Sequence, residues 1–300
     1  MQWSVYFQNP EFLEYTRLFL IQPELKPLVR AWCGIRDGMK ILDVGCGTGY
    51  FTRLLAEGGE NVAITGLDLE EPFIAYAKEQ AEKQQLDISF LVGDALNLPF
   101  EDESFDLVTS HTFLTSVPDP ERAMNEMKRV LRPGGCVASV TTMSYLPFMQ
   151  YIGEYPPECA WVSEFRKLEE QINQAYYTLD SILPRIAGVK PAAVPRFFAA
   201  RGLENICAYP IGKMVCLSNA AVSREEKLEW ISLYQASELK KLDAYMRLEQ
   251  MRDLISASDA QRYRLLIQEK CKWLTAHTDE NAVWDMQGGA NLLVTGRKPE

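Results

Sequence analysis

The stretch ILDVGCGTGYFTRLL, residues 41–55, decides how this chain folds. It holds an apolar run, then glycine at three alternate positions (Gly45, Gly47 and Gly49), then a second run with apolar residues at helical spacing. This order predicts a buried strand, a tight turn and a helix. Because glycine adopts positive φ and lets another group approach the backbone closely, the turn also predicts a ligand site.

The same alternation continues to about residue 143. Strands are predicted at residues 40–45, 61–69, 87–95, 104–112 and 135–143. Helices are predicted at residues 50–59, 70–84 and 119–131, the last of them stopped by RPGG at 132–135. Strands that alternate with helices of this length favour an α/β fold with a parallel sheet covered on both faces.

Outside this core the chain is predicted to be mostly helical. We divide it into a helical lead-in, the ligand-binding core, a helical cap that returns to the sheet, a helical insertion and a final strand, over residues 1–37, 38–143, 144–218, 219–288 and 289–300. Two helices are predicted within 222–276, with capping boxes at Ser223–Glu226 and Ser258–Gln261.

The helical stretches 144–190 and 222–276 have two alternative uses. They could form a lid over the ligand edge of the sheet, or an oligomer contact that gives a homodimer. Composition does not separate the two.

Composition excludes several classes of partner. Among 300 residues, 31 are Lys or Arg and 41 are Asp or Glu, a formal net charge of −10, which argues against nucleic acid as a partner. The start, MQWSVYFQNPEF, lacks the features of a signal peptide, and no apolar run approaches the roughly 18 residues of a membrane span. We therefore expect a cytoplasmic protein with no membrane partner. The seven cysteines form no CxxC pair and there are two histidines, which predicts reduced thiols and no metal site.

Three aspartates lie at the ends of successive predicted strands: Asp43, Asp68 and Asp94. Ligands of an open parallel sheet bind beyond the carboxyl ends of its strands. Asp68 lies 25 residues after Asp43, near the position where a carboxylate accepts both hydroxyls of a ribose. The glycine spacing is GxGxG rather than the GxGxxG of dinucleotide-binding folds, and three carboxylates suit a cationic nucleoside better than a pyrophosphate.

In combination these motifs resemble the class I S-adenosylmethionine (SAM)-dependent methyltransferases, in particular the small-molecule branch that includes ubiquinone- and menaquinone-pathway enzymes. ILDVGCGTGYFTRLLA (41–56) is similar to their first motif, ITGLDLEEPFIAYAKEQA (64–81) to the second-strand motif, and FLVGDALNLPFEDESFDLVTSHTFLTSVPDPERAMNEMKRVLRPGG (90–135) to the motifs of the third and fourth strands. The resemblance covers residues 38–143. It implies a Rossmann-like, seven-stranded, mostly parallel sheet with helices on both faces.

Weaker similarity at VPRFFAARGLENICAYPIGK (194–213) and NLLVTGRKP (291–299) implies the last helix and the last two strands of that fold. In the family the final strand is antiparallel and inserts between its neighbours. The inserted helices would then interrupt the final hairpin.

The resemblance implies a role for each matching residue. Asp43, Gly45, Cys46, Gly47 and His111 would line the methionine half of SAM. Asp68 would hold the ribose hydroxyls with Leu69 against the adenine, and Asp94 would meet the adenine amine with Ala95 beside it. The implied reaction is in-line displacement of the methyl group onto a small molecule, with S-adenosylhomocysteine as product. SHTF at residues 110–113 replaces the Asn/Asp-Pro-Pro-Tyr turn of DNA and glutamine methyltransferases, which speaks against those substrates.

Several roles remain alternatives. His111 is the candidate general base, and a cofactor contact or a hydrogen-bonded wall residue are its other interpretations. Tyr6, Tyr15 and Arg17 are candidates to close over the SAM carboxylate, with packing or surface as the alternative.

The acceptor is left open among a quinone-like ring, an amine, a carboxylate, a natural-product scaffold and an arsenical. A non-catalytic SAM-binding module is the second hypothesis. An NAD-type oxidoreductase is the third, disfavoured by the position of Gly49.

Overall fold

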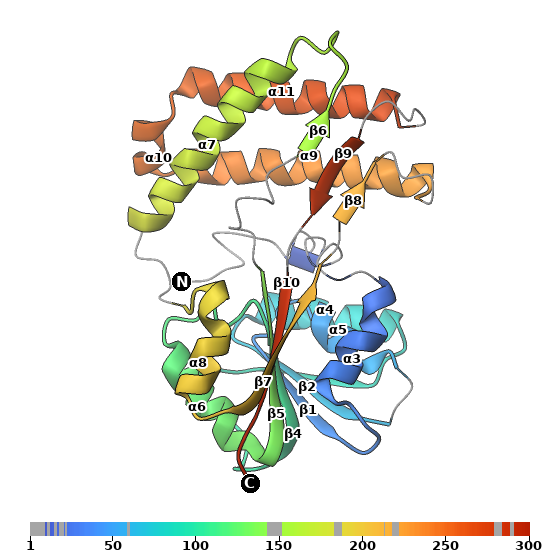
Figure 1. Cartoon of the computed structure of the whole chain (residues 1–300), viewed down its shortest axis with the longest axis vertical. Helices are drawn as coiled ribbons and strands as arrows, with labels where there is room; N and C mark the ends of the chain where they lie inside the picture. Colours follow the sequence, from blue (N-terminus) through green and yellow to red (C-terminus); the bar gives the residue numbers. More distant parts are fainter. Residues whose placement is uncertain are drawn as a thin grey trace. The chain divides into compact units, whose positions relative to one another are not determined.

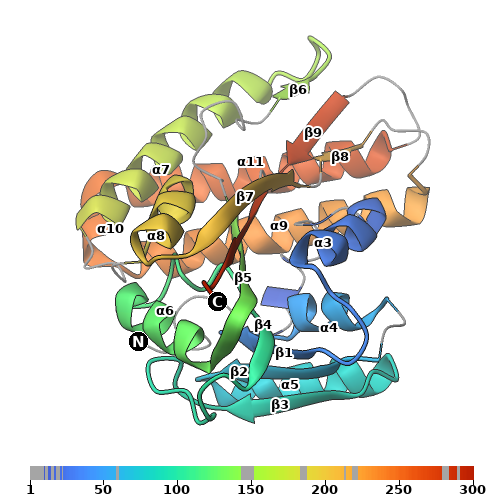
Figure 2. The ribbon, with the colours of Figure 1, turned by 60° about the horizontal axis from the view of Figure 1, so that its bottom comes forward.

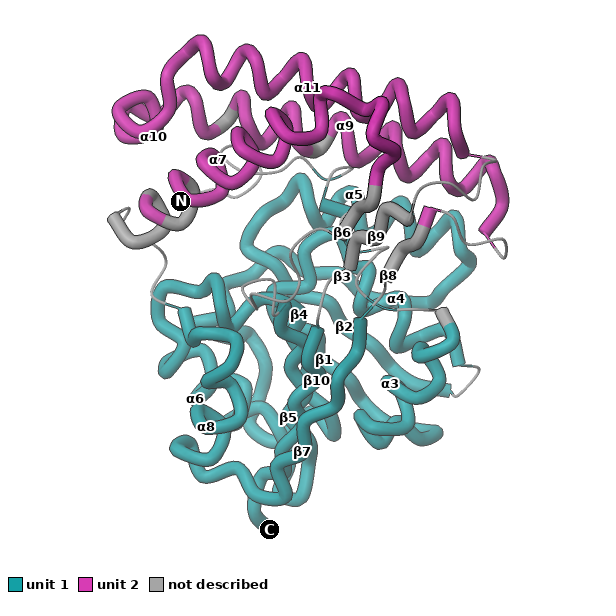
Figure 3. The backbone as a smooth tube through the Cα atoms, turned by 45° about the horizontal axis from the view of Figure 1, so that its top comes forward, with its two compact units in different colours: residues 1–149, 186–213, 288–300 teal, residues 150–185, 214–287 magenta. Residues whose placement is uncertain are grey.

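The computed structural model describes two compact units of the chain (Figure 3). Unit 1 comprises Met1–Met149, Ile186–Lys213 and Gly288–Glu300, and unit 2 comprises Gln150–Arg185 and Met214–Gln287. The residues described are 10, 13–14, 17, 21, 23–58, 61–142, 152–182, 188–212, 214–217, 222–278, 284–288 and 291–300.

Unit 1 is built on a seven-stranded sheet with the order β3-β2-β1-β4-β5-β10-β7. Its strands are β1 (Lys40–Val44), β2 (Ala63–Asp68), β3 (Ile88–Val92), β4 (Phe105–His111), β5 (Leu131–Thr142), β7 (Glu204–Ile211) and β10 (Asn291–Arg297). Figure 2 shows β3 at one edge of the sheet beside β2. In this sheet β10 alone runs opposite to the other six strands, and it lies between β5 and β7, with Leu293 opposite Val140 and Tyr209. The predicted mostly parallel sheet with an inserted antiparallel last strand is confirmed.

Helices cover both faces of this sheet (Figure 1). One face carries α3 (Lys26–Cys33), α4 (Tyr50–Ala56) and α5 (Glu71–Lys83), and the other carries α6 (Pro120–Val130) and α8 (Val194–Ala200). Successive strand residues therefore enter different cores: Ile41 packs with the side chains of α3 and α4, and Leu42 with those of α6 and α8. Burial on both faces explains why the central strands are continuous apolar runs.

Unit 2 contains α7 (Val162–Ile182), α9 (Arg224–Met246), α10 (Glu249–Leu254), α11 (Ala257–Ala276) and a three-stranded sheet. The strands β6 (Ile152–Glu154), β9 (Trp284–Gly288) and β8 (Met214–Cys216) pair in that order, and the sequence did not predict this sheet. Residues 222–276, predicted as two helices, form three. Within the described chain, no helix combines the length and apolar character that crossing a membrane requires.

Two local predictions are wrong in detail. The helix predicted at residues 119–131 ends at Val130, just before RPGG as predicted, but β5 starts at Leu131 rather than at residue 135. Gly134, at φ +69°, donates its N–H to the Lys298 carbonyl at 3.0 Å, so this segment joins the sheet. The capping box at Ser223–Glu226 is confirmed, but the residue that caps α11 is Ser256 rather than Ser258.

The corrected cap predicts unequal effects of two neighbouring serines. Ser256 Oγ accepts the Asp259 N–H at 3.0 Å, whereas Ser258 Oγ lies 2.9 Å from Ser256 Oγ and only supports the cap. Ser256→Ala should lower the free energy of unfolding by about 1 kcal/mol, the usual value of an N-cap. Ser258→Ala should lower it by less than half as much. Urea unfolding followed by tryptophan fluorescence measures both, and equal effects would contradict the assignment of the cap.

Candidate active site

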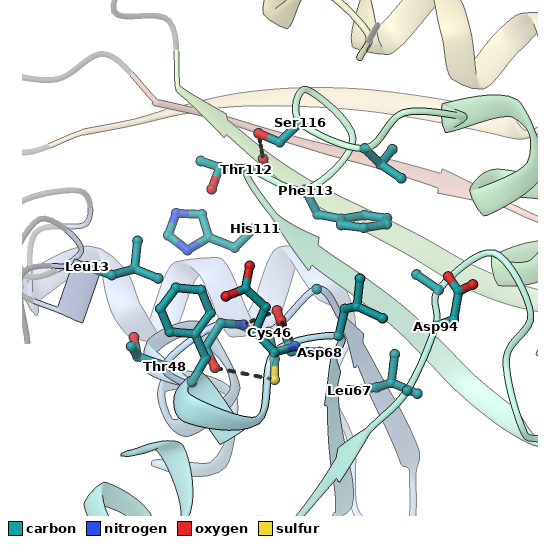
Figure 4. Close-up of a pocket in the computed structure, with 18 of the residues that line it drawn as sticks. Leu13, Cys46, Thr48, Leu67, Asp68, Asp94, His111, Thr112, Phe113 and Ser116 are labelled. Atoms are coloured by element: carbon teal, nitrogen blue, oxygen red, sulfur yellow. Dashed lines mark hydrogen bonds between the residues drawn. The ribbon is translucent and has the colours of Figure 1, made fainter. Parts of the chain in front are cut away.

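A pocket of about 360 Å³ lies at the carboxyl ends of β1, β2, β3 and β4, entirely within unit 1 (Figure 4). Its lining includes Gly45, Cys46 and Gly47 after β1, Asp68 and Leu69 at the end of β2, Asp94 and Ala95 after β3, and His111 at the end of β4. The structure thus brings together eight of the nine residues predicted for the cofactor. The volume lies in the range of small-molecule sites.

The glycine turn forms the floor of the pocket. Gly45 and Gly47 have φ of +67° and +55°, and the N–H groups of Gly45 and Cys46 both donate to the Leu67 carbonyl, at 2.8 and 3.0 Å. A Cβ atom at position 45 would lie within 2.7 Å of Phe113 Cγ. Conformation and space therefore both require glycine here.

Asp68 is held in place by the turn that it faces. Its Oδ2 accepts the Gly47 N–H at 2.8 Å, and its Oδ1 accepts the Glu70 N–H at 3.0 Å. Burial raises the pKa of Asp68, although these backbone hydrogen bonds favour the ionised form. Each carboxylate oxygen keeps a second lone pair, so the group can still accept from two ligand hydroxyls.

Asp94 lies at the other side of the pocket from Leu13 and Thr48 (Figure 4), and Leu69 also lines the pocket. Asp94 Oδ1 accepts the Leu96 N–H at 2.8 Å, which fixes the start of the loop after β3. Leu69 is 67% exposed, unusual for a large apolar side chain. An exposed apolar surface beside a fixed carboxylate suits a flat ring that carries an amine.

Asp43 is the one predicted residue that does not line the pocket. It is fully buried beneath the turn, where its Oδ2 accepts the Thr52 hydroxyl at 2.6 Å and its Oδ1 accepts the Thr109 hydroxyl at 3.0 Å. It therefore ties β1 to α4 and β4. Burial raises the pKa of Asp43 to about 6, and the two hydroxyl bonds oppose that shift.

His111 forms part of the pocket wall and is 7% exposed. Its Nε2 is buried and has no hydrogen-bond partner among the described residues. Burial first, and the charge of Arg17 second, lower the pKa of His111 well below its ordinary value of 6.5. The next residue, Thr112, has φ +53°, a conformation that bends the chain sharply at the end of β4.

Some lining residues were not predicted as site residues. They are Leu13, Thr48, Tyr50, Leu67, Glu70, Phe73, Gly93, Leu96, Phe113, Ser116, Val117 and Pro118. Phe113 and Ser116–Pro118 follow the end of β4 in the sequence. Their position after a strand end could therefore have predicted that they line the pocket. Arg17 also lines the pocket and donates from Nη2 to Thr112 Oγ1 at 2.9 Å, whereas Tyr6 and Tyr15 lie outside the described residues.

Six cysteines form no disulfide: Cys33, Cys46, Cys136, Cys159, Cys207 and Cys271. Cys46 reaches the pocket, and burial raises its pKa well above the ordinary value, so its thiol stays protonated. A protonated thiol is a poor nucleophile. Within the described residues, no group of three or more His, Cys, Asp or Glu side chains is arranged to hold a metal ion.

Comparison with known proteins identifies the family. A family model described as a methyltransferase domain matches residues 35–181. The demethylmenaquinone methyltransferase of Bacillus cereus is 32% identical over 204 residues, which cover 64% of this chain and 81% of that enzyme. The chain belongs to the class I SAM-dependent methyltransferases. The demethylmenaquinone methyltransferase of Staphylococcus aureus strain MRSA252 is 44% identical over 110 residues, 36% of this chain and 45% of that enzyme, so this chain spans under half of that relative.

Solved structures agree on the fold. Phosphoethanolamine N-methyltransferase 2 of Haemonchus contortus, in complex with S-adenosylhomocysteine, gives a TM-score of 0.52 at 15% identity and covers 99% of this chain and 59% of its own. The [4+2]-cyclase SpnF gives a TM-score of 0.53 at 17% identity, and the match covers 96% of this chain and 92% of the SpnF chain. At such identities the likeness shows the fold alone, and a cyclase among the neighbours shows that this fold does not by itself determine the reaction.

SAM is the cofactor of this family, and the pocket of this methyltransferase fits it. Gly45 and Gly47 add no side chain to the pocket floor, and a Cβ at position 45 would overlap the Phe113 ring, which also lines the pocket. The two Asp68 oxygens are oriented by backbone N–H groups and retain acceptor capacity for a ribose.

Two glycines with similar φ can separate the effect of backbone strain on stability from the effect of a steric clash on ligand binding. Gly38 has φ +78°, and a Cβ atom there would meet nothing within 4 Å, whereas Gly45 faces the Phe113 ring. Gly38→Ala should cost about 1 kcal/mol of stability and leave S-adenosylhomocysteine binding unchanged. Gly45→Ala should abolish binding. Calorimetry and thermal melts measure both effects, and retained binding in Gly45→Ala would contradict the close packing of this turn.

Asp43 predicts a pH dependence of stability. Its pKa is about 6 in the folded protein and 3.8 ordinarily, so the unfolded chain binds fewer protons between those values. The contribution of this group to the free energy of unfolding should therefore fall as the pH rises from about 4 to 6, by about 3 kcal/mol. Asp43→Asn should lack this component. Urea titrations of both proteins across this range test the prediction, and a constant difference between them would refute it.

Proposed function

We propose that this methyltransferase methylates an acidic carbon or hydroxyl of a small molecule with a quinone-like ring. The observation that carries the proposal is His111 Nε2, a buried nitrogen on the pocket wall with no hydrogen-bond partner among the described residues. The B. cereus and S. aureus relatives, which are demethylmenaquinone methyltransferases, support the ring class.

The charge state of His111 suits a proton acceptor. Because burial and Arg17 keep its pKa well below 6.5, the imidazole is neutral at neutral pH, and Nε2 can accept a proton when Nδ1 carries the hydrogen. Such a weak base removes protons only from groups that are themselves acidic. A ring hydroxyl, or a carbon beside one, meets this requirement. A neutral amine attacks before it loses a proton and has less need of the base.

The residues of this chain would divide the work of holding the cofactor. When bound, SAM supplies a methyl group on a positively charged sulfur, which the acceptor displaces in line. Asp68 would bind the ribose, Leu69 and Ala95 would enclose the adenine, and Asp94 would accept from its amine. The backbone at Gly45–Gly47 would line the methionine half. Because positioning and exclusion of water can carry most of such a rate enhancement, no enzyme nucleophile is needed.

The methionine carboxylate would meet Arg17. This side chain lines the pocket, and burial lowers its pKa to about 10, while the nearby Glu14 opposes the shift. A guanidinium removed from water gains from a charged partner that can accept two of its N–H groups.

Other expectations extend the proposal. We propose a cytoplasmic location and a homodimer formed through the helical stretches 144–190 and 222–276. The lid role of these stretches and the five-part division of the chain stay predictions. Light scattering during gel filtration would determine the oligomeric state.

Separate measurements of binding and turnover test the proposed function. His111→Gln should bind S-adenosylhomocysteine within about threefold of the wild type and lose about 10²–10⁴ in turnover of a reduced quinone. Asp68→Ala should lose binding. His277→Gln is the matched control. His277 lies in unit 2, where its ring stacks on that of Trp273 with 4.1 Å between the ring centroids, so this substitution should leave turnover unchanged.

The pH profile adds a second criterion. Because the pKa of His111 lies well below 6.5, lowering the pH through 6.5 should not protonate this residue. The wild-type rate should therefore not fall there on its account. A wild type that does not bind S-adenosylhomocysteine would overturn the proposal. Binding without turnover of any hydroxylated ring would favour the non-catalytic module.

A further inference from the structure

Three side chains fasten the N-terminal segment to the glycine turn. Glu14 Oε2 accepts the Thr48 hydroxyl at 2.8 Å, and Glu14 Oε1 forms an ion pair with the Arg53 guanidinium. Arg53 Nη1 also donates to the Thr48 carbonyl at 2.7 Å, which closes the triangle. The side chains of Arg53 and Glu14 are 3% and 12% exposed. We call Glu14, Thr48 and Arg53 the latch.

The latch fixes a segment that borders the pocket at two points. Leu13, adjacent to Glu14, lines the pocket above Gly47, where a Cβ would lie 3.3 Å from Leu13 Cδ2. Arg17, three residues after Glu14, reaches Thr112 Oγ1 at 2.9 Å. Leu13 and Glu14 therefore lie at the turn after β1, and Arg17 lies at the end of β4.

Arg17 is a partly buried cation that donates to a neutral hydroxyl, that of Thr112, within the described part of the chain. A guanidinium can donate two parallel N–H bonds to a carboxylate, a stronger interaction than one bond to a hydroxyl. Of the two ends of SAM, only the methionine end carries a carboxylate.

We propose that the latch positions Arg17 to bind the methionine carboxylate of SAM and of S-adenosylhomocysteine. Its members are positioning residues, since they act through Arg17. The inference rests on the proposed function only in taking SAM as the ligand. A buried ion pair is costly to form and sets geometry more reliably than it adds stability, which fits a positioning role.

If the latch has this role, removing it should weaken binding only of ligands that carry the methionine carboxylate. Calorimetry would compare S-adenosylhomocysteine with 5′-methylthioadenosine, a nucleoside that lacks the amino-acid carboxylate. Arg17→Gln and Glu14→Gln should weaken S-adenosylhomocysteine about 10- to 100-fold, the effect of one charge-assisted contact, and change 5′-methylthioadenosine less than about twofold.

Glu57→Gln provides the matched control. It removes an exposed ion pair to Lys26, at 2.7 Å, in the same unit and outside the pocket lining. Both ligands should bind this variant as they bind the wild type. If Glu14→Gln fails to fold in a thermal melt, Thr48→Val keeps the ion pair, removes one hydroxyl, and should weaken S-adenosylhomocysteine alone by a smaller factor.

The outcomes separate this inference from the proposed function. A wild type that binds neither ligand overturns the cofactor assignment, and the latch with it. A wild type that binds both, with variants that weaken both ligands equally or neither, overturns the latch and leaves the proposed function standing. Weakening confined to S-adenosylhomocysteine supports the latch.

Discussion

No side chain fits at position 45, and the rest of the site depends on that constraint. The N–H groups of Gly45 and Cys46 share the Leu67 carbonyl, which fastens the end of β1 to the end of β2. The Phe113 ring, which comes from the loop after β4, occupies the space where a Cβ would be. One turn therefore holds three strand ends together. The pocket lies at this point of the sheet because Gly45 and Gly47 add no side chains to the turn.

Three aspartates that look equivalent in sequence have different surroundings in the structure. Asp43 pairs in register with Gly66 on one side and Thr109 on the other, and Thr109 and Thr52 take up its carboxylate beneath the turn. Asp68 receives two backbone N–H groups and still faces the pocket. The position at a strand end is visible in the sequence. The sequence does not show which hydroxyls from other elements donate to each carboxylate, because those partners depend on the register between strands.

The same distinction explains how much of the fold could be predicted. Strands and helices of unit 1 follow from local periodicity, and the antiparallel last strand followed from the resemblance, so these predictions succeeded. Ser256 and Ser258 both precede acidic or amide residues at capping distance, and only the position of the helix start distinguishes them. Glu14 and Arg53 are 39 residues apart, and nothing in the sequence between them indicates that they pair. Contacts of this kind depend on tertiary packing.

The charged groups around the methionine side of the pocket form a connected series. Glu14 carries a negative charge that stabilises the Arg17 cation, and Arg17 in turn lowers the pKa of the buried His111. Under the proposed roles, a carboxylate bound to Arg17 would offset the part of the His111 shift that comes from this cation, while the larger part due to burial would remain. The positively charged sulfur of SAM would act in the opposite direction, as Arg17 does, and burial keeps the imidazole neutral in either case. The proton acceptor is therefore in its neutral form both before and after the methyl donor binds.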